Sequence, residues 1–209
     1  MKQIFKKLLV APLLLVSSIA FADIFNFNQV TANNVENLGS QLSVNVTDNG
    51  AGSVYFTFNN NVGIASSVAE IYFDNKLTNF FSGFSIISQI GTSMADGSTN
   101  PADPPGIASF VADYSVDVNP GPPANGLNNA ADFITIAGLL SGADFSDVIT
   151  AINGGAFDVA MHVRSIGQAV GSDSYNIVGT PNAVPLPAAA WLFMSGLGLF
   201  GIGKKRSKL

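Results

Sequence analysis

Four segments of the chain alternate hydrophobic and polar side chains with a period of two residues. They lie at residues 42–47, 54–58, 110–118 and 157–164. A period of two directs apolar side chains to one face of a strand and polar side chains to the other. Each segment is therefore predicted to be a half-buried antiparallel strand.

Weaker strand patterns occupy much of the remaining chain. They lie at residues 24–30, 68–73, 84–90, 133–139 and 174–178. Clusters of Asn, Asp, Gly and Pro separate the strands, most clearly at 95–106 and 119–129. Many short strands divided by turns favour two packed antiparallel sheets over a parallel sheet. The predicted fold class is all-β, a jelly-roll-like antiparallel β-sandwich with one short helix.

That helix is predicted from a different spacing. Four apolar residues recur at positions i, i+3, i+4 and i+7, namely Phe145, Val148, Ile149 and Ile152. Ser141 and Asp144 precede them with the spacing of a capping box, and a Gly-Gly pair follows. We expect a short capped helix that covers one end of the sandwich.

The first 22 residues are typical of a secretory signal peptide. Residues 1–7 are basic, residues 8–20 are 13 mostly apolar positions, and Ala20 and Ala22 occupy the positions that signal peptidase reads. A helix of that length extends roughly 20 Å, which is less than the ~30 Å hydrocarbon core of a bilayer. We therefore expect cleavage after Ala22 rather than a retained membrane span.

A second apolar segment follows the predicted strands. Residues 184–203 are 20 residues without a charge, and a helix of that length, roughly 30 Å, spans a bilayer. The positive-inside rule places the basic tail that follows in the cytoplasm; its basic residues are Lys204, Lys205, Arg206 and Lys208. Together with the signal peptide, this stop-transfer segment predicts that residues 23–183 lie outside the cytoplasm.

This region also resembles a known bacterial sorting signal. A proline motif comes first and consists of Val184, Pro185, Leu186, Pro187 and Ala188. An apolar Gly-rich transmembrane helix at 188–203 and a basic tail at 204–209 follow it. The combination is similar to the VPLPA-CTERM variant of the PEP-CTERM signal of Gram-negative bacteria.

The resemblance implies processing by an exosortase, which would cut within residues 184–188. Proteins with such signals are exported surface or matrix proteins, often produced beside exopolysaccharide systems. The implied organisation is a signal peptide at 1–22, an ectodomain at 23–183 and a sorting signal at 184–209. The implied route is an inner-membrane-anchored intermediate with a periplasmic body, followed by the cell surface or the extracellular space. A permanently anchored single-span protein has the same topology and is the alternative.

The charges divide sharply between the body and the two tails. All 14 acidic residues lie between Asp23 and Asp173, whereas residues 23–183 contain only two basic residues, Lys76 and Arg164. The body therefore carries 2 − 14 = −12 charges, and such a surface repels nucleic acid. The chain has no Cys, so the body is stabilised by packing and contains neither a thiol nucleophile nor a cysteine zinc site.

The residues that could support catalysis are few. His162 is the single histidine, and Asp158 would lie roughly 13 Å from it along the same strand. We expect His162 on a solvated face beside Arg164. Glu36 and Glu70 are the only glutamates, and no nucleophile-elbow motif occurs. No motif here carries a catalytic mechanism, so the body is predicted not to be an enzyme.

Calcium is the cation that the acidic loops would suit. Asp96, Asn100 and Asp103 lie in one Gly- and Pro-rich loop, and Asp144 and Asp147 lie at the predicted helix start. Oxygen ligands of this kind suit Ca²⁺. No EF-hand spacing occurs, and solvated turn acids are the favoured interpretation. No cofactor is therefore predicted, with calcium at the first three residues as the alternative.

The Phe-rich segment at residues 80–84 has two interpretations. Phe80, Phe81 and Phe84 could form an exposed patch that stacks on sugars, or could belong to the core. Phe lacks the polar handle that sugar-stacking rings carry, so the core is favoured.

The predicted function is an exported, exosortase-processed surface or extracellular-matrix protein with a non-catalytic acidic body. A carbohydrate-binding module for exopolysaccharide is the alternative, and a secreted hydrolase is a weaker one.

Overall fold

The fold was established from a computed structural model. It describes residues 21–34, 36–75, 79–97, 101–118, 121, 123–168, 171–177 and 179. The predicted sorting signal at 184–209, the predicted signal peptide up to Ala20, and Asn100 lie outside these residues.

The described residues form ten strands, one α-helix and one 3-10 turn. In chain order they are β1 (Ala22–Gln29), β2 (Leu42–Asp48), β3 (Ser53–Asn60), β4 (Ser67–Asp74), β5 (Phe81–Ile90), β6 (Ala95–Asp96), β7 (Tyr114–Asp117), η1 (Pro123–Asn125), β8 (Phe133–Leu140), α1 (Phe145–Gly154), β9 (Asp158–Ile166) and β10 (Gly171–Ile177). All strand pairs are antiparallel.

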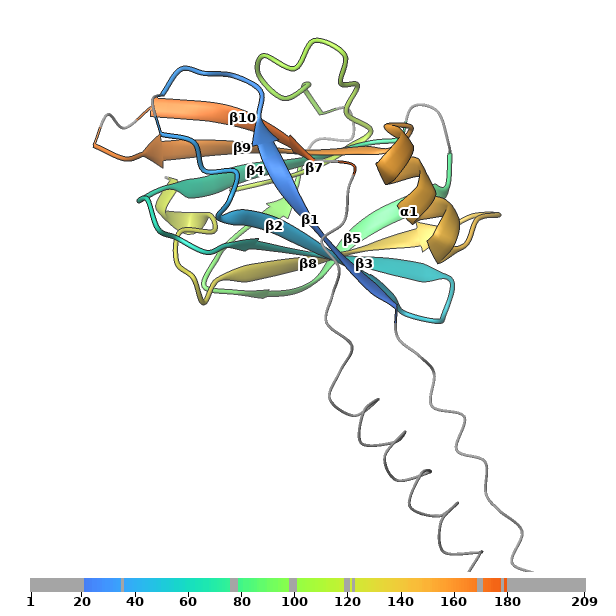
Figure 1. Cartoon of the computed structure of the whole chain (residues 1–209). Helices are drawn as coiled ribbons and strands as arrows, with labels where there is room; N and C mark the ends of the chain where they lie inside the picture. Colours follow the sequence, from blue (N-terminus) through green and yellow to red (C-terminus); the bar gives the residue numbers. More distant parts are fainter. Residues whose placement is uncertain are drawn as a thin grey trace, which may run out of the picture.

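The ten strands make one continuous sheet that folds over itself. Their order is β5-β8-β3-β2-β1-β10-β9-β4-β7-β6. Strand β1 belongs to both halves, because Phe25 pairs with Val44 of β2 whereas Phe27 pairs with Ile177 of β10. Figure 1 shows β1 crossing from one layer to the other. We call β5, β8, β3, β2 and the first half of β1 the first layer, and the remaining strands the second layer.

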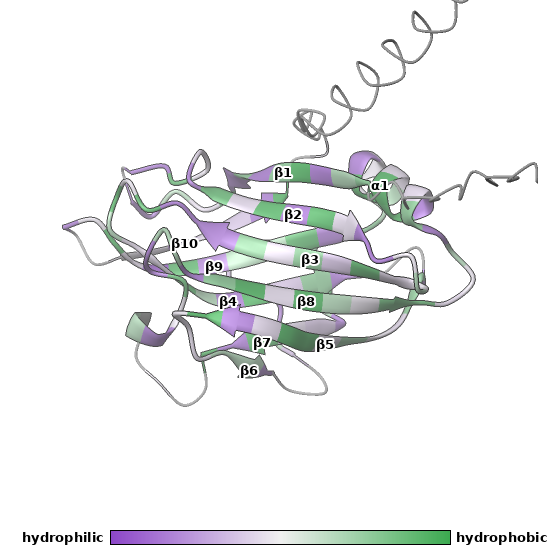
Figure 2. Cartoon of the chain, turned by 90° about the horizontal axis from the view of Figure 1, so that it is seen from below, coloured by the Kyte–Doolittle hydropathy of each residue, from purple (hydrophilic) through white to green (hydrophobic). Residues whose placement is uncertain are grey.

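The hydrophobic core lies between the two layers. Inward residues of β3 and β4 meet there, as in the edge-to-face contact of Phe56 and Phe73, whose ring centroids lie 5.2 Å apart. Phe84 of β5 packs 4.7 Å from Phe73 by the same measure. Figure 2 shows the first layer with β1, β2, β3, β8 and β5 side by side and the second layer behind it. Without disulfides, this packing holds the layers together.

The predicted all-β antiparallel body with one short helix is confirmed. All nine predicted strands overlap observed strands. The two layers, however, are joined through β1 into a single sheet rather than forming two separate sheets.

One predicted strand is wrong over its first four residues. Residues 110–113 alternate in polarity, but β7 begins only at Tyr114. Val111 donates its backbone N–H to the Asp74 carboxylate at 2.9 Å, which turns the chain across the outer face of the second layer. Phe110 is buried there against Tyr72. The apolar positions therefore belong to a covering loop, because period-two alternation reports burial of one face and not strand pairing itself.

The helix is confirmed, but its cap lies three residues later than predicted. Asp144 is the N-cap, and Asp144 and Asp147 each accept a hydrogen bond from the other's backbone N–H, at 3.0 Å. The prediction of Ser141 and Asp144 as the capping pair is wrong, because the chain at Ser141 still continues from β8. Gly155 ends α1 in the left-handed conformation at φ 68°.

No helix of the described residues is long and apolar enough to cross a membrane.

The packing of β8 against β5 depends on Gly138. A Cβ at Gly138 would lie 2.6 Å from two ring carbons of Phe81, which is closer than non-bonded carbon atoms approach. We expect Gly138→Ala to lower the free energy of unfolding by about 1–3 kcal/mol, because the rings beside it must move. Urea denaturation measures this change. Gly83→Ala, on the neighbouring strand, is the control, because nothing lies within 4 Å of its added Cβ; an equal loss in both variants would contradict this account.

Candidate functional site

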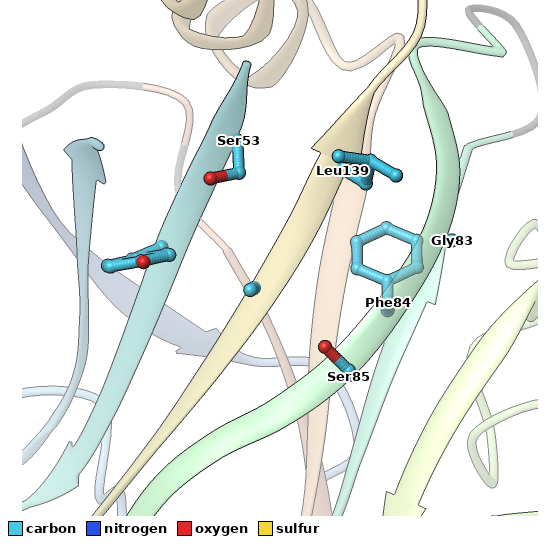
Figure 3. Close-up of a pocket in the computed structure, with 7 residues that line it drawn as sticks. Ser53, Gly83, Phe84, Ser85 and Leu139 are labelled. Carbon is cyan, nitrogen blue, oxygen red and sulfur yellow. The ribbon is translucent and has the colours of Figure 1, made fainter. Parts of the chain in front are cut away.

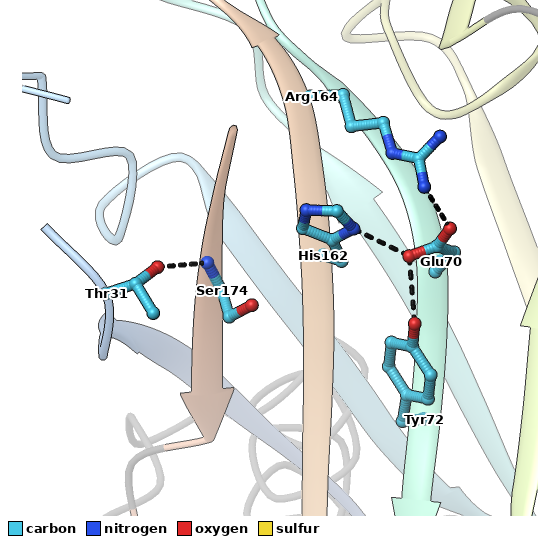
Figure 4. A network of polar contacts seen from close by, with 6 residues as sticks. All are labelled: Thr31, Glu70, Tyr72, His162, Arg164 and Ser174. Atoms are coloured by element: carbon cyan, nitrogen blue, oxygen red, sulfur yellow. Dashed lines mark hydrogen bonds and ion pairs between the residues drawn. The ribbon is translucent and has the colours of Figure 1, made fainter. Parts of the chain in front are cut away.

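A cluster of charged side chains lies on the outer face of the second layer. Glu70 of β4 is the register partner of His162 on β9. Its Oε2 lies 2.6 Å from His162 Nδ1 and accepts a hydrogen bond from the Tyr72 hydroxyl at 2.8 Å. Its Oε1 accepts a hydrogen bond from the Arg164 guanidinium. Figure 4 shows these groups converging on Glu70. Both oxygens of the carboxylate are therefore engaged.

The prediction of a solvated face for His162 is wrong in part. His162 points outward beside Arg164 as expected, but it is only 7% exposed. It lies between Glu70 on one side and β10 on the other. The alternation along β9 indicated the face correctly, but whether that face is covered depends on neighbouring strands and loops.

The electrostatics of the cluster favour the ionised form of Glu70. Burial raises the pKa of Glu70, but hydrogen bonds from His162 and Tyr72 and the charge of Arg164 outweigh burial and hold the pKa below its usual value. Burial, together with the nearby charge of Glu70, raises the pKa of Asp117 on the adjacent strand β7. The carboxylate of Glu70 is thus an acceptor committed to three donors, and not a free general base.

Ser174 completes an arrangement that could suggest a hydrolase. It is the register partner of His162 on β10, so Ser174, His162 and Glu70 lie on three adjacent strands in the order of a Ser-His-acid relay. Ser174 is only 1% exposed, and its hydroxyl oxygen is buried without a hydrogen-bond partner in the described structure. Its backbone N–H donates to Thr31 Oγ1 at 2.8 Å. The segment after β1 therefore holds this serine, and no hydrogen bond joins it to His162.

Asp173 holds the segment after β1 in place. This carboxylate is 1% exposed and accepts five hydrogen bonds. Its donors are Gln29 Nε2, Thr31 Oγ1, the backbone N–H groups of Asn33 and Asn34, and Asn34 Nδ2. Burial raises the pKa of Asp173, but these donors outweigh burial and the pKa lies below its usual value. The role of Asp173 is structural, because every donor comes from residues 29–34.

The predicted calcium ligands lie in structural hydrogen bonds where they are described. Asp103 Oδ1 accepts the backbone N–H of Ala112 at 2.9 Å, and Asp96 accepts the hydroxyl of Tyr114. Asn100 lies outside the described residues. Within the part of the chain that the structure describes, no three His, Asp or Glu side chains are grouped to hold a metal ion.

A second candidate site is a shallow depression on the outer face of the first layer. It has a volume of about 370 Å³ and spans β3, β8 and β5 (Figure 3). Hydroxyl groups and apolar side chains share its lining, which consists of Ser53, Tyr55, Gly83, Phe84, Ser85, Ala137 and Leu139. Leu139 is 55% exposed. No sequence motif marked this depression, because its residues come from three strands that only the sheet order brings together.

The two layers differ strongly in charge. Strands β3, β5 and β8 contain no Asp, Glu, Lys, Arg or His. Strands β4, β6, β7, β9 and β10 of the second layer each contain at least one acidic residue. The depression therefore lies on the uncharged part of an acidic body.

The prediction of core positions for the Phe-rich segment is confirmed. Phe81 is 9% exposed, and Phe80 and Phe84 pack against the core from its edge. Phe84 also contributes to the lining of the depression.

Comparisons with protein-family models, curated proteins and solved structures found no match to this chain.

The Glu70 cluster is expected to stabilise the second layer. Glu70→Gln removes the charge that Arg164 and His162 face, so we expect the free energy of unfolding at pH 7 to fall by about 1–3 kcal/mol in urea denaturation. Because the folded-state pKa of Glu70 lies below its usual 4.5, this contribution is complete above that pH and is lost as the pH falls through the folded-state value. Below pH 4.5, the variant should therefore lose less stability than the natural protein.

Arg164→Gln is the matched comparison for this prediction. The Arg164 side chain is 40% exposed, so its removal should cost less than about 1 kcal/mol. If Arg164→Gln lowers the free energy of unfolding as much as Glu70→Gln, the expectation that Glu70 contributes more to stability than Arg164 is contradicted.

Proposed function

We propose that this chain is an exported surface or extracellular-matrix protein that is sorted by its C-terminal segment. The observation that carries the proposal is the order of Val184–Ala188, an uncharged apolar stretch and a basic tail, in a chain that starts with a signal-peptide pattern. Signal peptidase and an exosortase are the proposed processing partners. The inner membrane is a transient anchor, and the body is then displayed at the cell surface or released.

The fold supports a body whose described core does not need the predicted signal peptide. Of that peptide, Phe21 accepts the backbone N–H of Asp48 at 3.1 Å and Ala22 pairs with Thr47 of β2. Among the described residues, the core is built from side chains between Phe25 and Ile177, and β1 begins at Ala22. Cleavage after Ala22 would remove one residue of β1 and leave the pairing of Phe25 with β2 and of Phe27 with β10. We also propose that the folded sheet is a jelly-roll-like β-sandwich.

The polar clusters support a role without catalysis. Both carboxylate oxygens of Glu70 are engaged by neighbouring side chains, and the hydroxyl oxygen of Ser174 is buried. A hydrolase needs a nucleophile that a substrate reaches and a base within hydrogen-bond distance of it. The proposed body therefore acts through its surface, in structure or adhesion.

Processing is tested by intact mass measurement of the protein extracted from the surface of its natural host. We expect the mature chain to begin at Asp23 and to end within residues 184–188. A mass that still includes Trp191 to Leu209 would contradict exosortase cleavage and support the permanently anchored alternative. A host without the exosortase is the control and should accumulate the longer chain.

Binding of a neutral polysaccharide is the second candidate function, and the depression on the first layer favours it. Tyr55 supplies a ring with a polar handle, the type of side chain that packs on sugar rings. Ser53 and Ser85 supply hydroxyl groups beside it. The strands that line the depression carry no charge, so they neither attract nor repel a charged ligand. The ligand class is a neutral glycan, because an acidic polysaccharide would be repelled by the −12 body.

Affinity electrophoresis against dextran, a mixed-linkage β-glucan and a mannan tests this second function. We expect at least one of these polymers to retard the protein and alginate, an acidic polymer, not to do so. Tyr55→Ala should abolish the retardation by removing the ring, and Tyr55→Phe should keep most of it. Val111→Ala, an exposed residue of the loop over the second layer, is the control. Equal retardation of Tyr55→Ala and the natural protein would contradict a site at the depression.

A further inference from the structure

Strand β5 ends the sheet with an open edge. It is ten residues long and, among the described strands, it pairs with β8 alone. Most of its residues are exposed, including Ile87 at 46% and Ile90 at 57%. In an antiparallel strand, about half of the residues direct their backbone N–H and C=O groups away from the paired neighbour. These groups form a row of donors and acceptors that is suited to pairing with another strand.

The edge has neither charges nor proline, two of the features by which sheet edges usually resist pairing, and its ladder with β8 is interrupted only by two register shifts, between Phe81 and Gly83 and between Ile86 and Ser88. Its sequence, FSGFSIISQI, contains no Lys, no other charged residue and no Pro. The opposite end of the sheet provides the contrast, because β6 has only two residues and one of them is Asp96. Short, charged edges of that kind discourage strand addition. The two edges of one sheet are therefore differently equipped for pairing.

The charge distribution indicates which partner fits this edge. Two bodies of −12 charges each repel one another over most of their surfaces. Pairing through β5 brings together β5 and β8, which carry no charge. From the second layer, β6 lies close to β5, and Asp96 is its single charged residue. An antiparallel strand pair about a two-fold axis also uses the same residues on both sides, so one sequence provides both halves of the interface.

We propose that β5 pairs antiparallel with β5 of a second copy of this chain and forms a sheet that is continuous across both molecules. Both first layers then present their outer faces on the same side, which places two copies of the depression on one extended uncharged surface. A single strand pair buries less area than the ~1,200 Å² typical of stable complexes, so the dimer is weak in solution. Anchoring or display at a surface raises the effective concentration and promotes pairing.

Single-cysteine cross-linking tests the pairing in the full chain, which has no cysteine of its own. Cysteine is substituted one position at a time at five of the exposed residues of β5, namely Ser82, Ser85, Ile87, Ser88 and Ile90. In a two-fold antiparallel pair, a residue meets its own copy only near the axis. We therefore expect disulfide-linked dimers at one position or two neighbouring ones, with a decline in both directions.

Val111→Cys is the matched control, because Val111 is as exposed as Ile90 but lies on the loop over the second layer. Cross-linking at Val111 equal to the β5 maximum would indicate random collision and overturn the proposal. So would the absence of cross-linking at every β5 position. Cross-linking at all β5 positions alike would indicate a parallel arrangement and would also overturn it.

Sedimentation of the full chain in detergent gives an independent test. Ile87→Lys places two like charges near each other in the dimer, so we expect its dissociation constant to rise at least about tenfold. Val111→Lys changes the net charge equally and should leave the constant unchanged. A natural protein that stays monomeric up to the highest soluble concentration would overturn the proposal, as would equal effects of the two substitutions.

Discussion

The structure depends on strand β1 being shared between the two layers. Its first half pairs with β2 and its second half with β10, so the backbone ladder passes from one layer to the other without interruption. Phe25 and Phe27, on either side of this transition, are both buried in the core. In a chain without disulfides, the shared strand and the packed aromatic core are the links between the layers. The outer faces of the two layers are positioned by this arrangement.

One consequence is that the two outer faces have different physical characters. Each of strands β4, β6, β7, β9 and β10 of the second layer carries an acidic residue. Two of these carboxylates make internal contacts: Glu70 joins β4 to β9, and Asp173 holds the segment after β1. The first layer has no charge on three adjacent strands. Contacts between molecules favour the face on which no charge must be desolvated. The proposed glycan site and the proposed pairing edge both belong to that face.

The proposed export route and the fold suit one another. Secreted proteins that lack disulfides must obtain their stability from a core of sufficient size, and the described body supplies one. Ser174 is buried, and both carboxylate oxygens of Glu70 accept hydrogen bonds. The polar contacts of these residues in the second layer are therefore structural. A displayed protein of this kind would act through recognition and assembly, for which an extended sheet offers a large and regular surface.

The sequence by itself determined nine of the ten described strands and the short helix, because period-two and period-3.6 patterns follow from local geometry. It missed the two-residue strand β6, which lies in a segment predicted as a turn. The proposed export and sorting segments are likewise predicted from linear sequence motifs. Only the tertiary structure decided that residues 110–113 form a covering loop, that His162 is buried against Glu70, and that β5 is an open edge. These features depend on which strands become neighbours across long separations, such as 92 residues between Glu70 and His162. No local pattern encodes that order, because it depends on contacts between segments that are far apart in the chain.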